Sequence, residues 1–420
     1  MSFDIALSGI QAINEQLETV SHNIANAATY GFKSGRANFS TVMAGTKANG
    51  VEIGSVTQNI SQNGSTTTTG RGLDAAIDGR GFFVSRDDQG GLTYTRVGIF
   101  STDTEGYLID SNGKKVQGYG PANGGALGAM GDVKVPTGQI DASATTSIAY
   151  VGNLSADWDA PKEPVFDSSK SNSYNMVKQS VVYDSLGSKH TMSQYFVKSG
   201  DNTVNVYYSM DGARITNGTP DPKDPITPPA VTVTKDNTNT LTFGTNGQLA
   251  ASTADAANGT QKRLTIPAGQ GAAEVNFTID YTGTTLFAGT ATTTTNRSDG
   301  YASGAFVGVE LAQDGSLVAK YSNDQSQVVG TVAIATFANE GALQAISDTS
   351  WTANADSGAA LYNAPGVGLA GKLSTGALEG SNVDITSELV GLMTSQRNYQ
   401  ANSKVLTTES QMMQALMQAL

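Results

Sequence analysis

Both ends of the chain carry apolar residues at the spacing of a helical seam. Near the N-terminus, these residues recur at alternating intervals of three and four, which places them on one narrow stripe of an α-helix. A stripe of this kind, kept over about three heptads, is typical of a coiled coil. Its members are Phe3, Ala6, Ile10, Ile13, Leu17, Val20 and Ile24. We therefore expect a helix over residues 1–25.

A second stripe occupies the other end of the chain and is narrower. Its members repeat every seven residues, and the companion positions in the middle of the segment are polar. We expect this helix to begin near residue 385, after Asp384, with Thr386 or Ser387 as its cap. The apolar repeat consists of Leu392, Tyr399, Leu406, Met413 and Leu420.

The chain between the two stripes has the spacing of turn residues that is typical of antiparallel β structure. Short apolar runs, such as those at 81–84 and 328–334, are separated by Asp-Gly, Asn-Gly and Gly-Gly pairs. The 48 glycines and the low charged fraction of 15% favour the same β-rich, loop-rich fold. We predict a mainly β protein with terminal α-helices.

The predicted domain organisation is nested, because the two ends pair and everything between them is inserted. Residues 26–72 contain few large apolar side chains and are expected to be an extended connector, with residues 360–384 as its return. The expected domains are an inner two-helix coiled coil from 1–25 and 385–420, a first β domain from 73–146 and 286–359, and an outer β domain from 147–285.

Composition argues against several classes of function. A formal net charge of −12 disfavours nucleic acid and anionic membranes as partners. The absence of cysteine and the presence of only two histidines, His22 and His190, leave catalytic triads and metal sites poorly supplied. We expect no catalytic residue, no cofactor and no metal. The N-terminus lacks the basic segment of a secretory signal, and no apolar run is long enough to span a bilayer.

Four ordered blocks of sequence resemble the flagellar rod and hook axial protein family. They are the run SHNIANAATYGFK at 21–33 and the blocks at 73–84, 94–120 and 380–406. Taken alone, residues 29–33 indicate a turn with Gly31 at an unusual φ and Lys33 in solvent. Joined to the other blocks, they are expected to fix the exit of the connector from the helices. The motif residues are Asn23, Asn26, Thr29, Gly31, Phe32, Lys33, Asn382, Val383 and Asp384.

The resemblance implies a structural role rather than an enzymatic one. A hook subunit of this family polymerises with copies of itself into a curved, flexible tube that transmits motor torque to the filament as a universal joint. It is exported by the flagellar type III apparatus without a cleaved signal, and it lies in the extracellular hook. Its implied partners are the hook cap, the distal rod, the hook–filament junction proteins and the export apparatus. The stripe residues are then expected to contact neighbouring subunits, and we expect the terminal helices to be poorly ordered in the free subunit.

Three alternatives remain open. A distal rod or other axial subunit would share the four blocks, but the long insertion at 147–285 favours the hook. A secreted β-rich adhesin would bind its ligand through that same inserted segment. A glycoside hydrolase would need paired carboxylates and aromatic platforms, which two tryptophans, Trp158 and Trp351, supply poorly.

Overall fold

The chain divides into two compact units, which we call the helix-bearing unit and the inserted unit. The computed structural model describes residues 2–45, 47–121, 127–163, 165–214, 216–217, 232–233, 238–252, 260–266 and 271–419. The helix-bearing unit comprises Met1–Thr137, Phe306–Lys320 and Ser326–Leu420, and the inserted unit comprises Gly138–Ala305 and Tyr321–Gln325.

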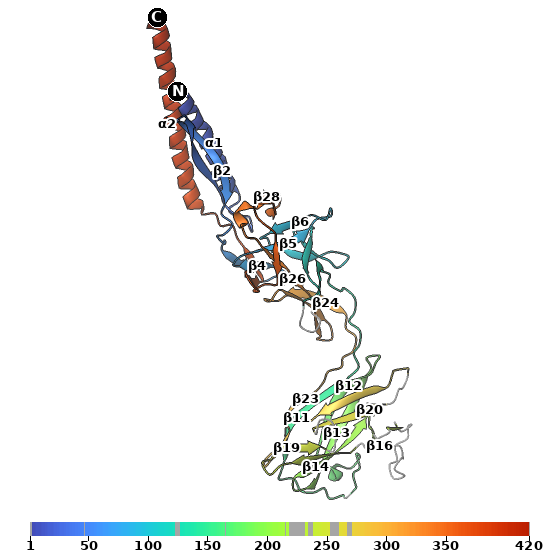
Figure 1. The fold of residues 1–420 in the computed structure, drawn as a ribbon. Helices are drawn as coiled ribbons and strands as arrows, with labels where there is room; N and C mark the ends of the chain where they lie inside the picture. The colour runs from blue at the N-terminus through green and yellow to red at the C-terminus, as the bar shows by residue number, and fades with distance from the viewer. Residues whose placement is uncertain are drawn as a thin grey trace. The chain divides into compact units, whose positions relative to one another are not determined.

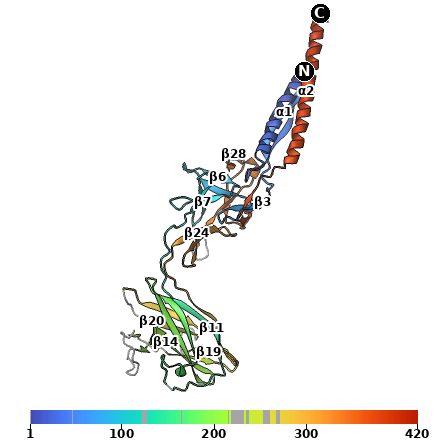
Figure 2. The same cartoon turned by 180° about the vertical axis from the view of Figure 1, so that it is seen from behind.

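The two expected terminal helices are present and lie side by side. Helix α1 spans Ser2–Ala25, and helix α2 spans Ile385–Ala419; Figures 1 and 2 show them together from opposite sides. The cap of α2 is Asp384 rather than Thr386 or Ser387, because its Oδ1 accepts the backbone N–H groups of those two residues at 2.9 and 3.3 Å. Within the described residues, neither helix is long and apolar enough to cross a membrane.

A long β-hairpin follows α1, where the sequence predicted an extended connector. Strands β1 (Gly35–Ala44) and β2 (Lys47–Gln58) pair antiparallel and pack along α1. The Asn38 amide donates to the hydroxyls of Ser55 and Thr57 across the pair. The expectation was wrong because the hairpin is stabilised by packing against the helix. The apolar residues of the hairpin are too few to predict two strands from the sequence.

The rest of the helix-bearing unit is a β domain built from both halves of the chain. A thirteen-stranded sheet has the central order β24-β25-β26-β9-β5-β6-β29-β28, and two small pairs, β3–β32 and β4–β31, join chain segments that lie far apart in sequence. Its core includes Phe82, Phe337 and Trp351. The strands are β3 (Thr66–Thr68), β4 (Ala75–Asp78), β5 (Phe82–Arg86), β6 (Leu92–Thr95), β7 (Phe100–Thr102), β8 (Leu108–Asp110), β9 (Lys115–Tyr119), β10 (Met130–Asp132), β24 (Phe306–Leu311), β25 (Ser316–Tyr321), β26 (Ser326–Val332), β27 (Ile334–Thr336), β28 (Gln344–Ile346), β29 (Ser350–Thr352), β30 (Leu361–Asn363), β31 (Lys372–Thr375) and β32 (Ala377–Glu379).

The inserted unit contains two larger sheets whose facing side chains form one core. One sheet has the order β20-β21-β11-β22 with β23 beside β11, and the other has the order β12-β13-β14-β18-β19 with β15 beside β14. The strands are β11 (Ser147–Ser155), β12 (Met176–Tyr183), β13 (Lys189–Gly200), β14 (Thr203–Met210), β15 (Ala213–Arg214), β16 (Thr216–Asn217), β17 (Thr232–Val233), β18 (Asn239–Phe243), β19 (Leu249–Ser252), β20 (Gln261–Ile266), β21 (Val275–Asp280), β22 (Thr285–Phe287) and β23 (Thr292–Ser298).

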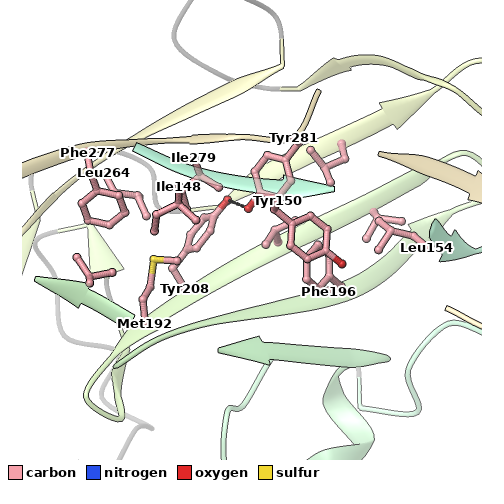
Figure 3. Packing of buried hydrophobic residues seen from close by; sticks show 14 of the residues in the cluster. Ile148, Tyr150, Leu154, Met192, Phe196, Tyr208, Leu264, Phe277, Ile279 and Tyr281 are labelled. Atoms are coloured by element: carbon pink, nitrogen blue, oxygen red, sulfur yellow. Dashed lines mark hydrogen bonds between the residues drawn. The ribbon is translucent and has the colours of Figure 1, made fainter. Parts of the chain in front are cut away.

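The core of the inserted unit follows from the alternation of buried and more exposed positions along several of its strands. On β14, Val204, Val206 and Tyr208 point to the buried face, and β21 and β11 alternate in the same way. Figure 3 shows side chains from both sheets meeting, with the hydroxyls of Tyr208 and Tyr281 joined at 2.9 Å. A hydrogen bond of this kind lets a buried tyrosine contribute its apolar ring without leaving its hydroxyl unsatisfied.

The inserted unit is longer than the predicted outer domain. Strand β23 pairs antiparallel along β11 from Ile148 to Asn153 and so belongs with it, although the prediction ended this domain at residue 285. The Thr-rich sequence of β23 has little apolar signal of its own. Its place is decided by pairing, which periodicity alone does not reveal.

Candidate functional site

The N-terminal stripe is only partly used within the chain. Ile13 and Val20 are buried, as are the small residues Ala6 and Ala12. Phe3, by contrast, is 49% exposed. The remaining stripe residues, Ile10, Leu17 and Ile24, are half-buried. The buried face of α1 therefore uses only part of the predicted stripe, and it also includes Ala12, which lies outside that stripe.

The C-terminal stripe is largely in solvent. Leu392 and Leu406 are half-buried, whereas Tyr399 and Met413 are exposed, and the side chain of Leu420 lies outside the described residues. Among the described residues of α2, only Ser395 is buried. The α2 side of the seam thus combines small and polar groups with the half-buried Leu392 and Leu406, while Tyr399 and Met413 of the heptad stay exposed.

A small residue on α1 allows close contact at this seam. A Cβ atom added to Gly9 would lie 2.8 Å from Nδ2 of Asn402. Sequence reasoning missed both residues, because neither is apolar; the signal available was a glycine within a helix that otherwise has good helix formers. Most of the large apolar side chains of α2 nevertheless stay exposed.

Exposed apolar side chains follow α2 along its length. Most are half or more accessible in the single chain, which is unusual for a helix that already has a partner. They are Ile385, Leu389, Val390, Met393, Tyr399, Val405, Met412, Met413, Leu416 and Met417. We call this set the α2 apolar face, and with 3.6 residues per turn its members lie on more than one side of the helix.

Asn23, at the end of α1, forms hydrogen bonds that connect α1 to β1 and to α2. Its side-chain amide exchanges two hydrogen bonds of 2.8 Å with the backbone of Gly35 at the start of β1, and it also donates to Oε1 of Glu388 on α2 at 2.9 Å. The residue is buried. An asparagine is well suited here, because its amide both donates and accepts.

The turn after α1 is formed by the next motif residues. The Asn26 amide donates to the carbonyl of His22 at 2.9 Å, and the Thr29 hydroxyl donates to Oδ1 of Asn26 at 3.2 Å. Gly31 has φ of +68° and donates its N–H to the carbonyl of Glu379 at 2.8 Å. Phe32 is buried and packs edge-on against the ring of His22.

Lys33 is buried rather than solvated, which corrects the reading of this turn in isolation. Its Nζ donates to Oε1 of Glu379 and to the carbonyl of Gln62, both at 2.7 Å. Burial lowers the pKa of the Lys33 ammonium, and the bond to Glu379 acts in the opposite direction. Arg96 donates to the other oxygen of the same carboxylate at 3.2 Å, and burial also lowers the pKa of its guanidinium.

The second half of the motif closes the same region from the C-terminal side. Oδ1 of Asn382 accepts the N–H of Ser34 at 2.7 Å, and its Nδ2 donates to the carbonyls of Asn59 and Gln62 at 2.8 and 3.0 Å. Val383 follows it, half-buried, and Asp384 caps α2. Together the motif residues form what we call the junction, where the segments after α1, after the hairpin and before α2 meet.

A groove lies beside the junction in the helix-bearing unit. Among the described residues, no group of three His, Asp or Glu side chains is placed to hold a metal ion. A groove of about 700 Å³ runs between α1, the hairpin and α2, and is lined by residues such as Gln16, Phe39 and Gly391. The buried charges of the junction are paired with one another and do not face this groove.

Comparisons with known proteins identify the family. Three family models match: the flagellar hook protein FlgE/F/G D1 domain over residues 76–156, the flagellar basal body protein FlaE D2 domain over 153–301, and the flagellar basal body rod FlgEFG protein C-terminal over 374–419. The chain is 37% identical to the flagellar hook protein FlgE of Salmonella typhimurium, with 99% of each chain covered. The chain belongs to the flagellar hook protein FlgE family. The resemblance predicted from the four sequence blocks is confirmed.

Other FlgE proteins match over nearly the whole chain as well. The FlgE of Escherichia coli is 36% identical, again with 99% of each chain covered, and that of Rhizobium meliloti is 31% identical with 98% of this chain covered. A solved structure of Helicobacter pylori flagellar hook protein FlgE2 is 13% identical and covers 68% of this chain and 93% of that chain, with a TM-score of 0.46. The FlaE D2 match lies within the inserted unit, and the C-terminal match contains α2.

Proposed function

We propose that this chain is a structural subunit of the bacterial flagellar hook and that it works by polymerising with copies of itself into a curved, flexible tube. The observation that carries the proposal is the α2 apolar face, on a chain related over its full length to flagellar hook proteins. Burying a large apolar side chain contributes about 1.5–3 kcal/mol. A helix that leaves a row of them exposed gains substantially when neighbouring subunits cover them.

The stripe residues then fall into three classes. Ile13 and Val20 are buried within the chain and hold α1 in place. Phe3, Tyr399 and Met413 are exposed and are the better candidates for subunit contacts. The half-buried members, Ile10, Leu17, Ile24, Leu392 and Leu406, serve the helix pair and keep part of their surface for a neighbour.

The wider setting is part of the same proposal. The subunit is exported through the flagellar pathway without a cleaved signal, assembles between the distal rod and the hook–filament junction beneath a cap, and lies outside the cell. The tube transmits motor torque as a universal joint. The nested domain order supports this role, since both chain ends belong to one helical pair and the inserted unit is a separate compact body.

A charge placed on the α2 apolar face should block assembly without unfolding the subunit. Met413→Asp adds a charge that must be buried when subunits pack, whereas in the free chain Met413 is 60% exposed. We expect salt-induced tubes to disappear in negative-stain electron microscopy, while thermal unfolding of the monomer is unchanged. The matched control is Gln411→Asp, which adds the same charge about half a turn round the helix.

Two outcomes would count against the proposal. Tubes of normal length from Met413→Asp would show that this face is not a subunit contact. Loss of tubes from Gln411→Asp to the same degree would show that net charge, and not the apolar face, controls assembly.

A further inference from the structure

The centre of the junction is a buried cluster of three charged side chains. Oε1 of Glu379 lies 2.7 Å from Nζ of Lys33, and its Oε2 lies 3.2 Å from Nη1 of Arg96. All three side chains are 0–1% exposed. Buried charges of this kind are costly to desolvate and are retained where their geometry is well satisfied.

Other hydrogen-bonding groups of the cluster hold backbone from separate segments, whereas Nε of Arg96 is buried without a hydrogen-bond partner among the described residues. Lys33 also donates to the carbonyl of Gln62, and Arg96 donates through Nη2 to the carbonyl of Gly79 at 2.9 Å. Oε1 of Glu379 accepts the N–H of Gly64 at 3.1 Å. The Glu379 carboxylate therefore receives donors from the segment after α1, the segment after the hairpin and the β domain.

These segments are the ones through which the helices and the hairpin join the β domain. Lys33 follows α1 and precedes β1, and Glu379 ends β32 shortly before α2. Arg96 follows β6 in the β domain, where its guanidinium also lies 5.3 Å from the ring centre of Phe82 in the core. The cluster thus connects both helix roots to a fixed point in the β core.

The charge balance makes Glu379 the critical member. Two buried cations share one carboxylate, so removal of its charge leaves both cations without the partner that offsets their desolvation. Glu340 is the next acidic group to influence both cations, and it is itself paired with Arg80 at 3.0 Å. It is therefore already engaged by another cation.

We propose that Glu379 is a positioning residue that acts as an ionic clasp and fixes the direction in which the α1–α2 pair leaves the β domain. Apolar packing at a junction resists separation but tolerates sliding, whereas two charge-assisted bonds to opposite oxygens of one carboxylate define a geometry. The clasp makes the helix-bearing unit one mechanical body. In a hook subunit, torque taken up by the helices would pass to the β domain without rotation at this point.

The distance between α1 and the β domain can be measured directly, because the chain has no cysteine. Spin labels are attached to Glu18→Cys on α1 and Ser111→Cys in the turn between β8 and β9, both exposed positions. Pulsed electron paramagnetic resonance on the full-length monomer gives the distribution of label–label distances. We expect Glu379→Gln to broaden that distribution by about twofold, since the two helix roots lose their common anchor.

Two further variants separate positioning from stability. The double variant Lys33→Met/Glu379→Gln removes one charge of each sign, so the net charge of the cluster stays the same, and we expect the same broadening in a folded protein. Val84→Ala, a truncation in the β core that removes no charged group of the clasp, is the matched control. It should lower the unfolding temperature and leave the distance distribution at its wild-type width.

The result that overturns the proposal is a wild-type width in the double variant, whatever Glu379→Gln does. If neither clasp variant folds in the helix-bearing unit while the inserted unit remains folded, the cluster contributes stability rather than position, and the proposal is also wrong. Because the measurement uses monomers, these outcomes are independent of whether the chain assembles into tubes.

Discussion

The α1–α2 pair and the inserted unit differ in how much of their apolar surface is buried within the chain. In the inserted unit, alternating strands of two sheets close one core, and residues such as Phe277 and Tyr281 are 0–1% exposed. On α2, only Ser395 is buried among the described residues, and the α2 apolar face stays in solvent. Apolar side chains buried within one chain stabilise its fold, whereas a large set of exposed apolar side chains indicates a surface that binds another protein.

Truncating one apolar side chain in each region tests this difference most directly. Phe277→Ala removes a fully buried ring and should cost about 3–5 kcal/mol. Leu416→Ala, at a side chain 60% exposed, should change monomer stability by less than about 0.5 kcal/mol and weaken assembly instead. Urea unfolding followed by hydrogen exchange of peptides from β11 and β21 measures the first effect, and sedimentation of salt-treated protein measures the second.

Equal destabilisation of the monomer by both truncations would remove the distinction. It would mean that α2 already buries this surface within a single chain.

The junction can be compared with the hairpin turn through two glycines of similar φ. Gly31 and Gly45 have φ of +68° and +65°, so alanine at either site costs about 1–2 kcal/mol. A Cβ at Gly31 would also lie 3.0 Å from the backbone N of Val97, whereas nothing lies within 4 Å of one at Gly45. We expect Gly31→Ala to cost about 1–3 kcal/mol more than Gly45→Ala through this contact.

Fluorescence of Trp351 measures this difference. Trp351 is buried in the core of the β domain, and Trp158→Phe removes the other tryptophan of the chain. Equal costs at the two glycines would mean that the close approach at Gly31 relaxes freely.

The smallest expected effect is a pH dependence confined to the inserted unit. His190 lies between Asp211, at 2.7 Å, and Asp184, at 3.4 Å. Burial acts to lower the pKa of His190, but the bonds to Asp211 and Asp184 outweigh it and raise the pKa above the ordinary 6.5. The stabilisation is therefore fully present below pH 6.5 and is lost as pH rises through the folded-state pKa.

We expect the protection of β12–β14 amides to fall as pH rises above 6.5, after correction for the intrinsic exchange rate. In His190→Asn this dependence should disappear, and amides of the helix-bearing unit should lack it in both proteins. A wild-type slope in His190→Asn would assign the effect to another group.

Much of the fold could be predicted because its signals are local. The stripes gave both helices to within a residue or two, and the dense glycine punctuation indicated β structure between them. The hairpin at 35–58 was missed, and strand β23 was assigned to the wrong β domain, for a common reason. Each is stabilised by a neighbour, α1 in one case and β11 in the other, and carries little apolar periodicity of its own.

The junction marks the limit of sequence reasoning more sharply. The motif at 21–33 was recognisable as a pattern, yet Lys33 looked like a solvated lysine, and nothing near it in sequence indicated Glu379 or Arg96. The two acid–base pairs join residues 346 and 283 positions apart. Helix and strand periodicity relates residues within one element, and so it cannot predict contacts across such a separation.

By itself, the sequence determined the two helices, the β character of the middle and the family. Periodicity and turn chemistry depend on a few neighbouring residues, and so they can be recognised in the sequence alone. Only the tertiary structure decided which apolar side chains find cover within the chain, and which buried charges meet. Both depend on strand pairing and helix contact between distant segments, because desolvation and ion pairing are settled by what surrounds a group in space.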